Sequence, residues 1–131
     1  MSRDAQILIV EDNPRNMKLA TDVLDHHGYR ILQAGDAEQG LALARTEHPA
    51  LILMDVQLPG MDGVAALDRL RGDPETSGIP VVALTAFAMR SDRERFLAAG
   101  FDGYLEKPID VASFPRQIEA LLEGSGKEAP R

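Results

Sequence analysis

Short apolar runs alternate with longer segments of mixed polarity along the whole chain. The apolar runs occupy residues 7–10, 31–32, 51–54 and 81–84, with a weaker run at residues 104–105. Runs this short and this apolar are typical of strands that are buried on both faces of a parallel sheet. The segments that follow the runs have the apolar spacing of helices. The pattern therefore predicts an α/β fold in which a five-stranded parallel sheet is doubly wound between layers of helices.

The first three intervening segments carry residues typical of helix ends. Asn13-Pro14 supplies an N-cap and a proline suited to the first helical position, and Gly28 is placed to end that helix. Asp36 is the expected N-cap of the second helix. The third helix is expected to begin near residue 63 and to end at residue 72.

The last two segments also predict helices. Ser91 and Glu94 have the spacing of a capping box, which predicts that the fourth helix opens at Ser91. The fifth segment contains Pro115, which cannot donate a backbone hydrogen bond. We therefore expect Ser113 to be the N-cap of the fifth helix, with residues 111–112 irregular, Pro115 in the first turn and the last helical residue at 123.

Composition narrows the class of protein. The length of 131 residues indicates one domain, and the net charge of −7 argues against direct binding to nucleic acids or anionic membranes. The absence of cysteine excludes disulfides, thiolate metal sites and cysteine nucleophiles. No apolar stretch approaches the roughly 20 residues that span a bilayer, and the N-terminus is unlike a signal peptide. We expect a cytoplasmic protein without membrane insertion.

Polar residues stand at the carboxyl ends of the predicted strands, where ligands of doubly wound folds gather. They are Glu11, Asp12, Asp55, Thr85 and Lys107. Neighbouring carboxylates repel one another unless a cation joins them, and oxygen ligands favour Mg²⁺ over Zn²⁺. Thr85 and Lys107 are suitable donors for the oxygens of a phosphoryl group.

Each of these residues alone has an ordinary structural explanation. Asp55 alone fits a helix cap or a turn, and Glu11 and Asp12 fit the cap of the first helix. Thr85 alone fits a satisfied strand-end hydroxyl, and Lys107 a solvated charge. The functional interpretation therefore depends on the whole set lying at one edge of the sheet.

Four stretches carry a family resemblance. Residues 7–13, 51–63, 81–86 and 105–108 read ILIVEDN, LILMDVQLPGMDG, VVALTA and LEKP. Together they resemble the receiver domain of two-component response regulators, over about residues 5–123. Residues 11–18 and 85–89 are similar to those of DivK-type single-domain regulators, and receiver modules of hybrid histidine kinases share them too. Residues 124–131 are expected to form a short flexible tail, and the start at Met1 with this tail leads us to expect a complete chain without an output domain.

The resemblance implies a flavodoxin-like (βα)5 fold with strand order 2-1-3-4-5. It implies that Asp55 accepts a phosphoryl group from the phosphohistidine of a histidine kinase or histidine phosphotransferase. It also implies bound Mg²⁺, for which Mn²⁺ can substitute. The metal ligands would be Asp12, Asp55, the backbone carbonyl of Gln57 and, through a water, Glu11.

The same resemblance assigns a switch. Lys107 would contact the phosphoryl oxygens, with a cis Lys107-Pro108 bond orienting it, and Thr85 would hydrogen-bond one of them. Tyr104 matches the aromatic switch position on a face that binds partners according to phosphorylation. Phe87 lies near the phosphoryl site, where it either restricts water or packs locally. Leu19 is expected to be exposed on the first helix as a docking residue for the kinase.

A phosphatase, a cofactor-binding protein and a hybrid-kinase module are the alternatives to this function. An Asp-nucleophile phosphatase of the haloacid-dehalogenase type pairs its nucleophile with an acid two residues later, where this chain has Gln57. A flavodoxin-like cofactor site needs a phosphate-binding loop after the first strand, where Glu11 and Asp12 would repel phosphate. A receiver module of a hybrid kinase or phosphorelay stays open. We therefore expect a phosphoacceptor signalling protein rather than an enzyme, although it takes part in its own phosphoryl transfer and dephosphorylation.

Overall fold

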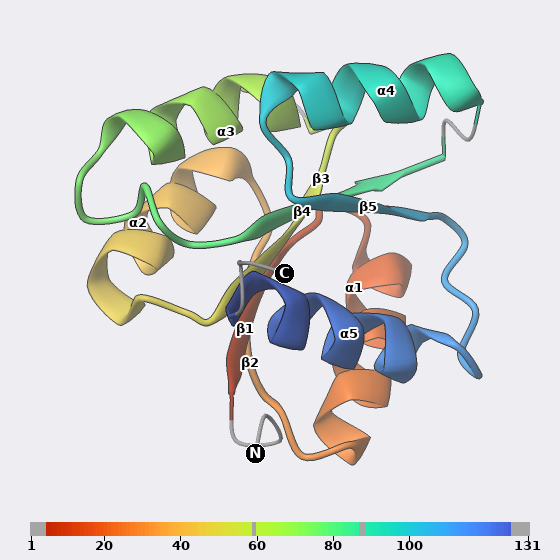
Figure 1. Ribbon diagram of the computed structural model, residues 1–131. Coiled ribbons are helices and arrows are strands. Elements are labelled where there is room, and N and C mark those ends of the chain that lie inside the picture. The colour runs from red at the N-terminus through yellow and green to blue at the C-terminus, as the bar shows by residue number, and fades with distance from the viewer. Residues whose placement is uncertain (1–4, 59, 87–88, 127–131) are drawn as a thin grey trace.

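The computed structural model describes residues 5–58, 60–86 and 89–126 (Figure 1). Strands and helices alternate along the chain. The strands are β1 (Gln6–Val10), β2 (Arg30–Ala34), β3 (Leu51–Asp55), β4 (Val81–Thr85) and β5 (Gly103–Glu106). The helices are α1 (Pro14–His26), α2 (Ala37–Glu47), α3 (Gly63–Gly72), α4 (Arg90–Ala99) and α5 (Phe114–Gly126). All strand pairs are parallel and the order is β2-β1-β3-β4-β5, which confirms the predicted fold.

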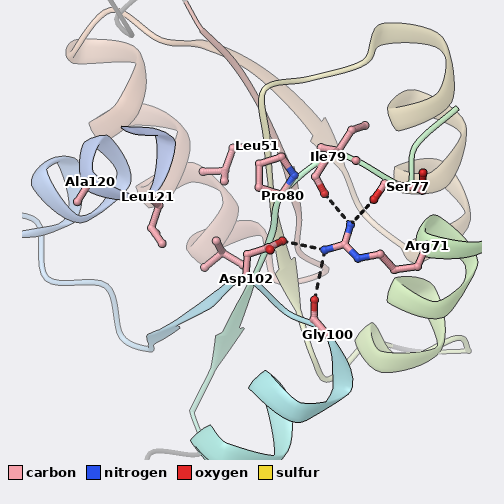
Figure 2. Close-up of a pocket in the computed structure, with 11 residues that line it drawn as sticks. Leu51, Arg71, Ser77, Ile79, Pro80, Gly100, Asp102, Ala120 and Leu121 are labelled. Atoms are coloured by element: carbon pink, nitrogen blue, oxygen red, sulfur yellow. Dashed lines mark hydrogen bonds and ion pairs between the residues drawn. The ribbon is translucent and has the colours of Figure 1, made fainter. Parts of the chain in front are cut away.

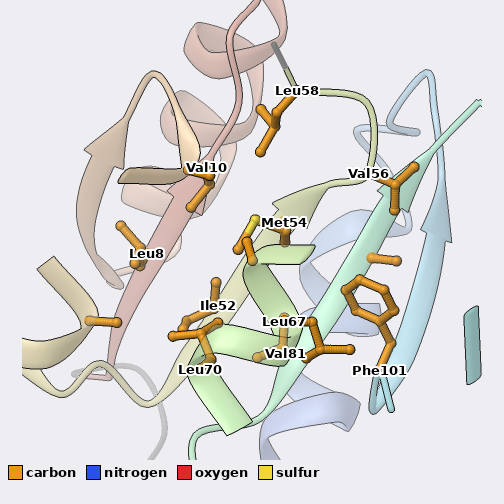
Figure 3. Close-up of a cluster of buried hydrophobic side chains, with 14 of the residues drawn as sticks. Leu8, Val10, Ile52, Met54, Val56, Leu58, Leu67, Leu70, Val81 and Phe101 are labelled. Carbon is orange, nitrogen blue, oxygen red and sulfur yellow. The ribbon is translucent and has the colours of Figure 1, made fainter. Parts of the chain in front are cut away.

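Two helix layers cover the sheet, with α1 and α5 on one face and α2, α3 and α4 on the other (Figure 1). Successive side chains of a strand point to opposite faces. Thus Leu8 and Val10 pack in the core on the α3 side, which Figure 3 shows, while Ile7 and Ile9 pack in the core against α1 and α5. The central strands β1, β3 and β4 are buried on both faces, which explains why their sequences are continuous apolar runs. Among the described residues no helix is long and apolar enough to cross a membrane.

The helix starts test the predicted caps. The side chain of Asn13 accepts hydrogen bonds from the first turn of α1, and that of Asp36 accepts one from Gln39, so both caps are confirmed. The capping box at Ser91 is wrong, because α4 begins at Arg90 with Met89 as an N-cap that makes no side-chain hydrogen bond. Ser91 therefore lies inside the first turn, where its side chain cannot act as the cap.

The start of α5 agrees with the restriction that proline imposes. The helix begins at Phe114, so Ser113 precedes it and Pro115 falls in the first turn, while residues 111–112 form a turn. The Ser113 hydroxyl does not cap the helix but donates to the Asp110 carboxylate at 2.9 Å. The helix continues to Gly126, three residues past its expected end, and residues 127–131 of the predicted tail lie outside the described residues.

The far end of α3 is tied to the amino-terminal edge of the sheet by Arg71 (Figure 2). Its guanidinium donates to the carbonyl oxygens of Ser77 at 3.1 Å, Ile79 at 2.7 Å and Gly100 at 3.3 Å, and to the Asp102 carboxylate at 2.7 Å. The same carboxylate accepts the N–H of Val81, the first residue of β4, at 2.8 Å. Arg71 and Asp102 also line a cavity of about 560 Å³ at this edge, the edge opposite the predicted site.

Candidate functional site at the carboxyl edge of the sheet

The strand ends bring together the polar residues that the sequence singled out. Asp55 and Thr85 are the last residues of β3 and β4, and Glu11 directly follows β1. Lys107 directly follows β5. Because all the strands are parallel, these four ends meet at one edge of the sheet. The predicted convergence of the side chains can therefore be tested by distances.

Lys107 joins the two buried carboxylates. Its Nζ lies 3.2 Å from Oδ2 of Asp55 and 3.3 Å from Oε1 of Glu11. The side chains of Asp55 and Glu11 are only 3% and 2% exposed, and that of Lys107 is 17% exposed. Burial by itself lowers the pKa of Lys107, but the charges of Asp55 and Glu11 outweigh it and raise the pKa above its ordinary value of 10.5. The ammonium therefore stays charged.

Backbone amides fix the orientation of both carboxylates. The N–H of Gln57 donates to Oδ1 of Asp55 at 2.9 Å, and the N–H of Asn13 donates to Oε2 of Glu11 at 3.1 Å. Among the described residues, no buried side-chain nitrogen or oxygen lacks a hydrogen-bond partner. Asp55 is thus held from two sides, by an ammonium on one oxygen and an amide on the other, as a preorganised nucleophile requires.

The acidic residues form a group that suits a divalent cation. Carboxylate oxygens of Glu11, Asp12 and Asp55 all lie within 4.8 Å of one another, with Asp12 open to solvent. Burial raises the pKa of the Glu11 carboxyl above its ordinary value of 4.5, and the neighbouring Asp55 raises it further, against the opposing effects of Asn13 and Lys107. One ammonium does not balance three carboxylates. An oxygen-only set with this excess of negative charge fits Mg²⁺.

Thr85 and Tyr104 lie on neighbouring strands beside this group. Thr85 is fully buried, and its carbonyl accepts the N–H of Lys107 at 2.8 Å, which ties the end of β4 to the lysine backbone. Tyr104 pairs with Ala83 across β4 and β5 and is half-buried against the core on the α4 side. The Lys107-Pro108 peptide bond is cis.

Arg93 contacts Tyr104, and sequence reasoning missed it. Its guanidinium carbon lies 5.0 Å from the centroid of the Tyr104 ring, within the range of a cation–π contact. Neither residue carries a motif that pairs them. Their contact depends on how α4 lies against β5, which no local pattern specifies.

The two remaining predicted residues are Leu19 and Phe87. Leu19 was expected to be exposed, and this is wrong, because its side chain is half-buried beside Ala20 of the buried stripe. A position about 100° from the stripe lies on the flank of the helix rather than on its outer face. Phe87 lies outside the described residues.

Comparisons with known proteins agree with this geometry. A family model for the response regulator receiver domain matches residues 7–119. The polar-differentiation response regulator DivK of Brucella ovis is 44% identical over 116 residues, which are 88% of this chain and 94% of that protein. The receiver domain of a sensor histidine kinase from Pseudomonas aeruginosa, solved with a magnesium ion coordinated in its active site cleft, is 36% identical with a TM-score of 0.83, covering 92% of this chain and 98% of that one. A putative response regulator from Chloroflexus aurantiacus is 29% identical with a TM-score of 0.85 and the same coverage of both chains.

Proposed function

Because this chain belongs to the receiver domain family of response regulators, we propose that it carries a phosphoryl group on Asp55. The donor is the phosphohistidine of a histidine kinase or a histidine phosphotransferase. The observation that carries the proposal is the Asp55 carboxylate, buried at the end of β3 between Nζ of Lys107 at 3.2 Å and the amide of Gln57 at 2.9 Å. A buried carboxylate held in this way at the ligand-binding edge can act as a nucleophile.

The transfer is a single displacement at phosphorus. A carboxylate oxygen of Asp55 forms a bond to phosphorus while the bond from phosphorus to the histidine nitrogen breaks, and the imidazole leaves. The product is an acyl phosphate on Asp55. The Lys107 ammonium, kept protonated by its raised pKa, lies 3.2 Å from the nucleophile and attracts the charge on the phosphoryl oxygens. Thr85 supplies a hydroxyl to one of those oxygens.

A divalent cation belongs to the proposed reaction. Asp12, Asp55 and the backbone carbonyl of Gln57 would hold Mg²⁺ directly, and Glu11 would hold it through a water. The grouping of three carboxylates within 4.8 Å supports this assignment, as does the magnesium ion in the related receiver domain from Pseudomonas aeruginosa. When bound, the ion offsets the negative charge of the carboxylates and of the phosphoryl oxygens. Mn²⁺ has the same preference for oxygen ligands and can substitute.

The proposed output is a change in a protein-binding face. Phosphorylation draws Thr85 towards the new oxygens, and Tyr104 moves into the space beside β4, which alters the surface formed by α4, β5 and α5. The 44% identity to DivK over 94% of its length supports a stand-alone response regulator. We propose that it acts in the cytoplasm through partner proteins. The alternative is a receiver module of a hybrid kinase. The sensor-kinase receiver from Pseudomonas aeruginosa supports it, but at a lower identity of 36%.

The test is intact-mass analysis after incubation with a small phosphodonor and Mg²⁺. We expect one acid-labile phosphoryl group per chain, absent from Asp55→Asn and present in the matched control Asp62→Asn, which keeps a capping side chain at α3. Phosphorylation of Asp55→Asn at the wild-type level contradicts the assignment.

A further inference from the structure

The first turn of α3 presses against the backbone of the proposed phosphoacceptor. A methyl group built on Gly63 would lie 2.7 Å from the carbonyl oxygen of Asp55 and 2.7 Å from Cα of Val56. The N–H of Gly63 also donates to the carbonyl of Val56 at 3.2 Å. These neighbours are backbone atoms, which cannot rotate away as the end of a side chain can. A hydrogen atom is the largest group that fits there without a shift of one backbone or the other.

Helix α3 has little freedom to be the part that shifts. Ala66, Leu67 and Leu70 on its inner face are fully buried in the core that Figure 3 shows. At its other end Arg71 donates to three carbonyls and to Asp102, as Figure 2 shows. The helix is therefore fixed to the sheet along its face and at its far end.

The segment that can yield is the one just after β3. Gln57 follows the contact by one residue, and its N–H donates to Oδ1 of Asp55 at 2.9 Å. A shift of the backbone at residues 55–57 would therefore change both the orientation of the Asp55 carboxylate and the position of the Gln57 amide and carbonyl. The close approach at Gly63 keeps all three in place.

We infer that Gly63 is a positioning residue, which sets the Asp55 carboxylate and the Gln57 carbonyl for phosphoryl transfer and metal binding by letting α3 sit directly on their backbone. The role of Gly63 in phosphoryl transfer and metal binding rests on the proposed function of Asp55. Its effect on the backbone at residues 55–57 does not depend on that function. Gly63 touches no reacting atom. It acts through the backbone of the residues that do.

Two other glycines provide matched controls. A methyl group on Gly72, the last residue of the same helix, meets nothing within 4 Å. A methyl group on Gly103, the first residue of β5, lies 2.9 Å from Cδ2 of Leu121 of α5, so it also disturbs a contact between a helix and the sheet, but against a side chain and at the edge opposite Asp55. Gly103→Ala therefore controls for loss of stability, and Gly72→Ala for the change of residue type within α3.

The experiment compares Gly63→Ala with these two variants in three measurements. The first is the amide NMR shift of Gln57 in metal-free, unphosphorylated protein, the second is Mg²⁺ affinity, and the third is the rate of Asp55 phosphorylation by a small donor. We expect Gly63→Ala to move the Gln57 resonance and to lower both the affinity and the rate by about tenfold or more, since misplacement of about 1 Å can cost a hundredfold. Gly103→Ala and Gly72→Ala should retain wild-type values in all three, whatever their melting temperatures.

A Gly63→Ala protein that binds Mg²⁺ and is phosphorylated within twofold of wild type, with an unmoved Gln57 resonance, overturns the inference. If Gly63→Ala does not fold, Arg71→Ala decides, because it releases the far end of α3 without adding a group near Asp55. It should move the Gln57 resonance at the opposite edge of the sheet, whereas Arg69→Ala on the exposed side of α3 should not. An unmoved resonance in Arg71→Ala then refutes the positioning role. Failure of wild-type protein to acquire a phosphoryl group would contradict the proposed function instead, and leaves the NMR comparison intact.

Discussion

Replacement of Arg93 by alanine should release Tyr104 from its present position. The guanidinium of Arg93 lies over the Tyr104 ring at 5.0 Å from the centroid. The other arginines of α4 have acidic neighbours, Arg90 with Glu94 at 3.7 Å and Arg95 with Asp92 at 3.4 Å. Among the described residues no salt bridge involves Arg93, so its contact with the ring is the interaction that the substitution removes.

The size of the effect follows from the exposure of the pair. Arg93 is exposed and Tyr104 half-buried, and an exposed cation–π contact is worth about 0.5–1 kcal/mol. If the contact exists only in the conformer that the structure shows, its loss shifts the equilibrium between the two Tyr104 conformers by about two- to fivefold. Arg93→Ala should therefore raise the basal population of the phosphorylated-like conformer without reaching the full response.

Fluorine NMR of protein containing 3-fluorotyrosine measures this shift without a partner protein. The chain has two tyrosines, and Tyr29, which is 4% exposed in the core beside α1, serves as an internal reference. In Arg93→Ala the Tyr104 resonance should move part of the way towards its position in wild-type protein saturated with Mg²⁺ and beryllofluoride, a stable phosphoryl mimic. Arg90→Ala, on the same helix and with the same change of charge, should leave it in place. Equal resonances in Arg93→Ala and Arg90→Ala, with and without the mimic, would refute the reasoning.

Three further outcomes are expected. Thr85→Ala should still acquire a phosphoryl group on Asp55, but its Tyr104 resonance should not respond to beryllofluoride; a full wild-type response would contradict the relay. Leu19→Asp should slow phosphotransfer from the cognate phosphohistidine domain while labelling by a small donor is unchanged, and equal rates from that domain would exclude docking at Leu19. In metal-free buffer Glu11→Gln should raise the melting temperature at neutral pH. Because burial raises the pKa of Glu11, the folded state favours the protonated carboxyl, and part of the wild-type stability is lost as the pH rises from about 4.5 through that pKa. A Glu11→Gln variant that melts no higher than wild type at neutral pH would contradict the raised pKa of Glu11.

The parts of the fold that were readable from the sequence are those set by local chemistry. The central strands were found because both of their faces are buried, and Asn13 and Asp36 were found because a capping side chain bonds within its own helix. The predicted capping box at Ser91 is wrong because it, too, rests on a local pattern alone. The spacing of Ser91 to Glu94 satisfies the local pattern, but the N-cap of α4 lies two residues earlier, at Met89, which offers no capping group.

The contacts that were not readable join residues far apart in the chain. The four hydrogen bonds of Arg71 reach two separate loops, and an arginine in the last turn of a helix has a sufficient local explanation in the helix dipole. The contact of Arg93 with Tyr104 depends on the angle between α4 and β5. The half-buried state of Leu19 depends on what lies along the flank of α1, which helical periodicity does not describe.

The strand order places carboxylates on one side of Asp55 and hydrogen-bond donors on the other. β3 lies between β1 and β4 in the sheet, so the end of β3 receives side chains from both directions. From the β1 side come the carboxylates of Glu11 and Asp12, and from the β4 and β5 side come the hydroxyl of Thr85 and the ammonium of Lys107. Asp55 therefore has carboxylates that suit a divalent cation on one side and hydrogen-bond donors on the other. The lysine comes from two strands away, and its long side chain covers that distance to within 3.2 Å of Asp55. A shorter residue at position 107 would leave the donor flank incomplete, which accounts for a long cationic side chain after the outermost strand.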